Sequence, residues 1–148
     1  MSQDPMSVAL AEAELAGEAG EVPVGAVLVD AEGRILAASG NRVEALRDPT
    51  AHAEMLAIRE AARALGTERL VDCDIYVTLE PCAMCAGALA FARIRRLYYG
   101  AADPKGGAVE NGVRFFASPT CHHRPEVYGG MAEQEAAALL RDFFAARR

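Results

Sequence analysis

The sequence has no long apolar run, and this absence limits where the chain is expected to work. No stretch approaches the ~18 consecutive apolar residues that a membrane-spanning helix needs. The first residues also lack a basic stretch followed by an apolar core, which is the pattern of a secretory signal. The sequence therefore predicts a cytoplasmic protein with no membrane partner.

Positive charge is also scarce. Lysine and arginine total 15 against 21 aspartates and glutamates, and the formal net charge is -6 at pH 7. This balance argues against a nucleic-acid partner, because nonspecific binding is driven by basic side chains that neutralise phosphates. The charges are uneven, however, so a local basic face on an acidic protein stays open. Acids crowd the first helix, and arginines come later: Glu12, Glu14, Glu18 and Glu21, then Arg93, Arg95, Arg96, Arg141, Arg147 and Arg148.

Cysteine is too sparse for a disulfide framework. Of four cysteines, Cys82 and Cys85 form a Cys-x-x-Cys pair, while Cys73 and Cys121 stand alone. In a cytosolic chain this usage indicates a metal site plus bystanders. Repeats, low-complexity segments and linkers are absent as well, and 148 residues with 52% hydrophobic content suit a single domain over residues 1–148.

Apolar patterning predicts alternating helices and strands, and therefore a three-layer α/β/α domain. The helix expected over 51–65 carries a stripe made of Met55, Ile58, Ala62 and Leu65. The last helix extends its own apolar stripe to Phe143, which predicts a core position for that ring. The expected helices are 5–19, 51–65, 82–92 and 131–148, the strands are 22–29, 34–38, 74–79, 96–100 and 126–128, and the irregular segments are 40–49 and 103–124.

Two short motifs carry the chemistry. Residues 50–54 contain His52-x-Glu54, and residues 80–85 contain Pro-Cys-x-x-Cys with Cys82 and Cys85. One imidazole and two thiolates are a ligand set for zinc, and three protein ligands leave the fourth tetrahedral position to water. Zinc lowers the pKa of such a water to about 7. Glu54 is the spare carboxylate that such a site needs to move protons.

The spacing predicts where this site lies. Cys82 and Cys85 are three residues apart, so on a helix both sulfur atoms lie on one face. Pro81 suits the first turn of that helix, and the helix dipole favours the thiolate form. His52 and Glu54 diverge by roughly 200° on an ideal helix and converge only beyond its N-terminus. We therefore expect the zinc between two helix N-termini.

The His-x-Glu…Pro-Cys-x-x-Cys pattern is also the signature of zinc-dependent nucleobase deaminases. Beyond the motif, the chain resembles the cytidine deaminase-like superfamily and, within it, the bacterial tRNA adenosine deaminases. Residues 104–121 depart from the pattern associated with that branch. The resemblance rests on residues 21–27, 40–42, 48–54 and 78–88, and is extended by Arg93-Ile94, Asp103-x-Lys105, His123-Arg124, Phe143-Phe144 and Arg147-Arg148.

The resemblance implies a cytidine deaminase-like fold, with a mixed sheet flanked by helices, and a homodimer. It implies zinc-dependent hydrolytic deamination of adenosine to inosine at the wobble position of tRNA, with one zinc per chain on His52, Cys82 and Cys85. Glu54 is then the catalytic proton shuttle, and a single-stranded anticodon stem-loop is the partner because the base must leave the stack. The implied substrate contacts are Asn41, Ala53, Asp103, Lys105, His123, Phe144, Arg147 and Arg148.

Two alternatives stay open. A deaminase of a free nucleobase or nucleoside, of the guanine or cytosine type, fits the acidic net charge and the departing segment 104–121. Its partner is then a small-molecule purine or pyrimidine. A binding module with a structural zinc and no turnover is the second alternative. A closed structural site, however, needs a fourth ligand, and no residue beside these motifs supplies one.

Overall fold

The computed structural model describes residues 4–147. Among them, no helix is both long and apolar enough to cross a membrane. In chain order the elements are α1 (Pro5–Glu18), β1 (Gly25–Val29), β2 (Ile35–Gly40), α2 (Val43–Leu46), α3 (Ala53–Leu65), β3 (Asp74–Leu79), α4 (Ala83–Ala92), β4 (Arg96–Ala101), η1 (Phe115–Ala117), β5 (Glu126–Tyr128) and α5 (Glu133–Ala145).

The five strands form one mixed sheet in the order β2-β1-β3-β4-β5. β1 pairs antiparallel with β2 and β3, whereas β3–β4 and β4–β5 pair in parallel. Parallel neighbours need a crossover, and α4 provides it between β3 and β4. This topology brings the carboxyl ends of β2, β3 and β4 to the same edge of the sheet.

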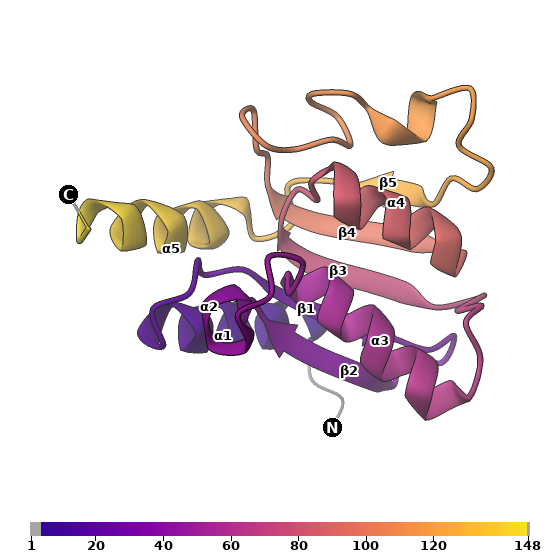
Figure 1. Ribbon diagram of the computed structural model, residues 1–148, viewed down its shortest axis with the longest axis horizontal. Coiled ribbons are helices and arrows are strands. Elements are labelled where there is room, and N and C mark those ends of the chain that lie inside the picture. The colour runs from indigo at the N-terminus through magenta and orange to yellow at the C-terminus, as the bar shows by residue number, and fades with distance from the viewer. Residues whose placement is uncertain (1–3, 148) are drawn as a thin grey trace.

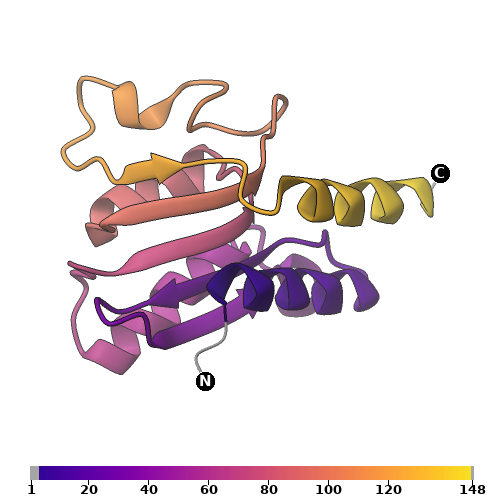
Figure 2. The ribbon, with the colours of Figure 1, turned by 180° about the vertical axis from the view of Figure 1, so that it is seen from behind.

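Helices cover both faces of the sheet, as Figures 1 and 2 show from opposite sides. α3 and α4 lie on one face and contact each other, while α1 and α5 lie on the other. The predicted three-layer α/β/α arrangement is therefore confirmed. Most of the length of α5 projects past the edge of the sheet (Figures 1 and 2).

Small residues set the spacing between α1 and the sheet. A Cβ atom on Gly25 of β1 would lie 2.0 Å from the carbonyl oxygen of Ala9 and 2.7 Å from the backbone nitrogen of Ala13. Both alanines are fully buried. The helix backbone thus rests directly on the strand, and no side chain fits at position 25.

The buried face of α3 differs from the predicted stripe. Ala53, Ala57 and Ala61, one turn apart, are fully buried, and Glu54 is buried beside them. Alanines let the helix approach the sheet closely, so the larger side chains flank the contact. The predicted stripe therefore forms only the flank of the core face. Ile58 and Ala62 are half-buried and pack against the core, whereas Met55 is half-buried outside it and Leu65 is 44% exposed.

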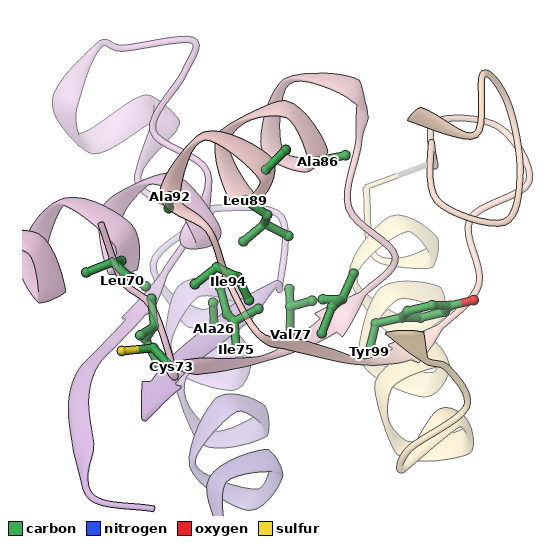
Figure 3. Packing of buried hydrophobic residues seen from close by; sticks show 14 of the residues in the cluster. Ala26, Leu70, Cys73, Ile75, Val77, Ala86, Leu89, Ala92, Ile94 and Tyr99 are labelled. Carbon is green, nitrogen blue, oxygen red and sulfur yellow. The ribbon is translucent and has the colours of Figure 1, made fainter. Parts of the chain in front are cut away.

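The main core lies between the sheet and the α3–α4 layer. Figure 3 shows Leu89 and Ala86 of α4 lying above Ile75 and Val77 of β3. Each of these four side chains is fully buried. Burial of apolar surface stabilises a fold by about 25 cal/mol per Å². This layer therefore holds in place the helix that carries the cysteines.

Element boundaries shift where local backbone chemistry forbids the regular structure. β1 begins at Gly25 instead of residue 22, because Pro23 has no N–H to donate to the ladder. A short helix, α2, occupies part of the expected loop 40–49. α5 begins at Glu133 because Ala132 has a left-handed backbone with φ of 54°.

The core position predicted for Phe143 was wrong: the ring is half-buried, outside both core clusters, where α5 passes the sheet edge.

Candidate active site

Three strand ends deliver polar residues to one edge of the sheet. β2 ends at Gly40 and is followed by Asn41; β3 ends at Leu79 and is followed by Glu80-Pro81-Cys82; β4 ends shortly before Asp103. The carboxyl edge of an α/β sheet is where such folds commonly bind ligands. The motifs found in the sequence therefore meet at this edge.

Two helices begin at the same place. His52 is the N-cap residue of α3 and Cys82 is the N-cap residue of α4, both with extended backbone. Figure 1 shows the two helices starting side by side. The Nδ1 atom of His52 lies 3.7 Å from Sγ of Cys82 and 3.6 Å from Sγ of Cys85. The prediction that these residues meet between two helix N-termini is confirmed.

The three ligand atoms fit a zinc ion. With Zn–S distances of about 2.3 Å and Zn–N of about 2.0 Å, tetrahedral geometry separates the nitrogen and sulfur atoms by about 3.5 Å. All three atoms lie within 4.8 Å of one another. Within residues 4–147 no fourth histidine, cysteine, aspartate or glutamate joins the group. Three protein ligands leave one coordination position for a reactant, as in a catalytic site.

Burial and hydrogen bonds tune the charges at this site. Glu54 is 4% exposed, and burial raises its pKa to about 7, so it can both take up and release a proton near neutral pH. A hydrogen bond from the thiol of Cys85 lowers the pKa of Cys82 to about 5, and the backbone N–H groups of Met84 and Cys85 act in the same direction. The first turn of α4 therefore favours a thiolate.

A cavity of about 310 Å³ opens beside these residues. Its volume is at the lower end of the range for small-molecule sites. His52, Glu54 and Cys82 form one part of its wall. Apolar side chains and the ends of β2 and β4 form much of the rest: Val22, Val24, Leu79, Asn41, Asp103 and Gly106.

Asn41 and Ala53, both predicted as substrate contacts, bond to each other. Oδ1 of Asn41 accepts a hydrogen bond of 2.7 Å from the backbone N–H of Ala53, at the first turn of α3. Asn41 lines the cavity. Ala53 is fully buried and its N–H group is already bonded to Asn41, so of this pair it is Asn41 that lines the cavity.

Asp103 and Lys105 lie on the loop after β4. Asp103 lines the cavity, and its Oδ1 accepts the backbone N–H groups of Lys105 (3.1 Å) and Gly106 (3.0 Å). This is an ordinary Asx-type turn in form, but it stands at the mouth of the candidate active site. The Lys105 side chain is exposed at the same turn.

The remaining predicted contacts lie away from the cavity within one chain. Nε2 of His123 donates to the carbonyl of Ile94 at 2.7 Å, which ties the ring to the other end of the sheet. Phe144 is 48% exposed at the end of α5. The guanidinium of Arg147 lies 3.5 Å from the ring centre of Phe143 and is exposed. Arg148 lies outside the described residues.

Two buried glutamates at the cavity were not singled out from the sequence. Glu21, grouped above with the acids of the first helix, is 4% exposed and accepts the N–H groups of Glu44 and Ala45 at the start of α2. Glu80 is 2% exposed and accepts hydrogen bonds from the loop after β4. The only sequence signal for Glu80 is its place directly before Pro-Cys-x-x-Cys.

Two of the later arginines are neutralised by ion pairs with acids of the same chain. Asp74 receives a bidentate pair from Arg95, with both N–O distances 2.9 Å. Nη1 of Arg96 lies 3.9 Å from Oδ2 of Asp74, and Nε of Arg96 lies 3.7 Å from Oε1 of Glu126. These two arginines therefore form ion pairs at the amino end of β4, and candidate phosphate contacts must come from other basic residues.

Comparison with known proteins gives consistent matches. Residues 1–101 match the zinc-binding region of cytidine and deoxycytidylate deaminases. The chain is 65% identical to the tRNA-specific adenosine deaminase of Agrobacterium fabrum over 97% of this chain and 93% of that protein. A solved structure from work on A-to-I editing by tRNA:A34 deaminases at the wobble position matches with a TM-score of 0.90 and 65% identity, covering 92% of this chain and 98% of that one.

A more distant relative has another substrate. The structure of a guanine deaminase from Nitrosomonas europaea matches with a TM-score of 0.82 and 27% identity, over 95% of this chain and 83% of that one. The same fold therefore occurs in relatives that are named for different substrates, adenosine in one and guanine in the other.

Proposed function

This chain belongs to the family of zinc-binding cytidine and deoxycytidylate deaminases, and from that premise we propose that it converts adenosine to inosine at the wobble position of tRNA. The observation that carries the substrate is the high identity, over nearly the whole of both chains, to a tRNA-specific adenosine deaminase. A tRNA substrate also fits the cytoplasmic location expected from the sequence.

The reaction is a hydrolysis in which water replaces the amino group on C6 of the purine and ammonia leaves. A zinc ion on His52, Cys82 and Cys85 would supply an activated nucleophile from water at neutral pH. Glu54 takes one proton from the attacking water and gives it to the ring nitrogen, then takes the second proton from the hydroxyl group now on C6 and gives it to the amino group, which leaves as ammonia. Its buried carboxyl, with a pKa of about 7, suits both directions of transfer.

The cavity suits one base that has left its stack. Its volume of about 310 Å³ accommodates a purine but no duplex. An anticodon loop is already single-stranded, so little pairing energy opposes the extrusion of its base. Within the cavity, Asn41 and Asp103 are the proposed polar contacts.

The phosphates need positive charge outside the cavity. Lys105 stands on the turn at its mouth, and Arg147 follows the end of α5. We assign these two side chains, together with Arg148, to the RNA backbone. Arg124 donates to the carbonyls of Phe116 and Ser118, which leaves it less free for phosphate. Phe144 provides an exposed ring for stacking on a base or for an interface.

We also propose a homodimer. On α4, Ala88 is half-buried and Phe91, three residues later, is 72% exposed. A small residue beside an exposed ring permits close packing of a second chain, which would bring elements such as the His123 segment toward a neighbouring site. Sedimentation should give a dimer, with Phe91→Glu shifting it toward monomer; a parent that sediments as a monomer at working concentration contradicts this proposal.

The competing function is deamination of a free base. The net charge of -6 and the departing segment 104–121 favour it. A panel of anticodon stem-loop, adenosine, cytidine, cytosine and guanine, with ammonia release as the readout, separates the two. We expect turnover of the stem-loop well above the other substrates. Turnover of guanine or cytosine instead would overturn the tRNA assignment, and no ammonia from any substrate would favour a binding module.

A further inference from the structure

Five hydrogen bonds from the loop after β4 converge on one carboxylate, that of Glu80. Oε1 of Glu80 accepts the backbone N–H of Asp103 (2.9 Å) and Nδ2 of Asn111 (2.7 Å). Oε2 accepts the backbone N–H groups of Val109 (3.1 Å), Glu110 (2.8 Å) and Asn111 (3.0 Å). All five donors belong to residues 103–111. Within residues 4–147 this segment has no neighbouring strand to accept its backbone N–H groups, and the Glu80 carboxylate accepts them instead.

The carboxylate of Glu80 is buried and closely packed against the loop. Glu80 is 2% exposed, and a Cβ atom on Gly107 would lie 2.6 Å from its Cδ atom. An ionised acceptor is the only state that suits five inward-pointing donors.

The attached loop forms a wall of the active-site cavity. Asp103 and Gly106 line it, and they lie at one end of the segment that Glu80 holds. On the other side of Glu80, the chain continues through Pro81 to the zinc-ligand position Cys82. The carbonyl of Pro81 accepts the N–H of Ala108 at 2.9 Å, which adds a second tie between the cysteine motif and the loop.

We propose that Glu80 is a positioning residue. It fixes the position of residues 103–111, which form a wall of the substrate cavity, relative to the zinc ligand Cys82. This inference rests on the proposed function, because it assigns the 103–111 wall to substrate binding. Glu80 acts through the loop, since both of its oxygens are occupied by loop donors. Its loss should therefore weaken substrate binding more than it affects metal binding or the proton transfer by Glu54.

The test compares two variants of this contact. Glu80→Gln replaces one acceptor with an NH₂ group that faces N–H donors, and should raise KM for the anticodon stem-loop about tenfold while kcat changes less. Asn111→Ala removes one donor, keeps the carboxylate, and should raise KM about threefold. Zinc content should equal that of the parent in both. Asp30→Asn is the control, because Asp30 accepts the N–H groups of Glu32 and Arg34 in a turn away from the cavity.

Hydrogen exchange supplies a readout that needs no substrate. In Glu80→Gln the amides of Asp103, Val109, Glu110 and Asn111 should exchange faster, while those of α3 and α4 keep the parent rates. Unchanged exchange at these amides overturns the proposal, and so does an unchanged KM when they do exchange faster. A parent that fails to turn over the stem-loop refutes the proposed function instead, and the exchange result still decides whether Glu80 holds the loop. If Glu80→Gln does not fold, Asn111→Ala carries both measurements.

Discussion

The N-terminal ends of α3 and α4 differ from the far end of α5 in almost every physical respect. The first region is built on fully buried alanines and holds His52 and Cys82 at fixed N-cap positions. α5 has only Ala136 buried among its helical residues and ends with an exposed phenylalanine and arginine. Chemistry that needs ångström precision is placed on the packed core, whereas the proposed contacts with a large substrate lie on an element with little core of its own.

Loss of a metal ligand should produce the largest effect. Cys82→Ser replaces a thiolate with a hydroxyl, which is a poor zinc ligand, so metal and activity should be lost together. Mass spectrometry for zinc and ammonia release provide the two readouts. Cys121→Ser is the matched control, because this cysteine donates to the carbonyl of His123 and lies outside the ligand group. A metal-free preparation with full activity would refute the catalytic zinc.

Loss of the proposed proton shuttle should be nearly as severe but should leave the metal in place. Glu54→Ala should lower kcat by about 10²–10⁴-fold, the usual contribution of general acid–base catalysis, with zinc retained. Glu60→Ala, an exposed glutamate on the same helix, should behave like the parent. Normal turnover by Glu54→Ala would show that another group moves the protons.

The two regions should also differ in their contribution to stability. Leu89 of α4 is fully buried, so Leu89→Ala should lower the free energy of unfolding by about 2–5 kcal/mol. Phe144→Ala on α5 removes a larger side chain that is 48% exposed, and should cost about 0.5 kcal/mol or less. Denaturant titration of both variants measures the contrast. Equal losses would mean that α5 is packed in solution, for instance against a second chain.

Charge removal at the end of α5 should have the smallest effect and should change binding alone. Removing one side chain that neutralises a phosphate should reduce the salt dependence of stem-loop turnover by about one unit of slope. We therefore expect Arg147→Ala/Arg148→Ala to show a shallower slope than the parent and unchanged stability. Arg34→Ala, an exposed arginine in the β1–β2 turn, should keep the parent slope. A parent insensitive to salt would support the free-base alternative.

The parts of the site that the sequence predicted correctly are those whose chemistry dictates residue type and spacing. Zinc needs nitrogen and sulfur ligands at short spacing, so the grouping of His52, Cys82 and Cys85 followed from two motifs. Strand and helix order followed from apolar periodicity, and β3 and β5 have the predicted bounds. The roles of Glu54 and the substrate contacts stay predictions, as does the single domain.

The features that the sequence did not predict depend on tertiary contacts. A stripe of Met55 and Ile58 is more hydrophobic than a stripe of alanines, yet the close approach of α3 to the sheet selected the alanines. Glu21 and Glu80 resemble surface acids in the sequence because their donors come from backbone 23 to 31 residues away. Phe143 extends a helical stripe, but the sheet ends before α5 does, so the ring has no core to enter.

The bond between Asn41 and α3 has a consequence for what the cavity reads. A backbone N–H only donates, so the 2.7 Å contact with Ala53 assigns the side-chain oxygen of Asn41 and leaves its NH₂ group as the end available to a ligand. We therefore expect the cavity to favour, at this point, a ligand atom that offers a lone pair over one that offers a proton.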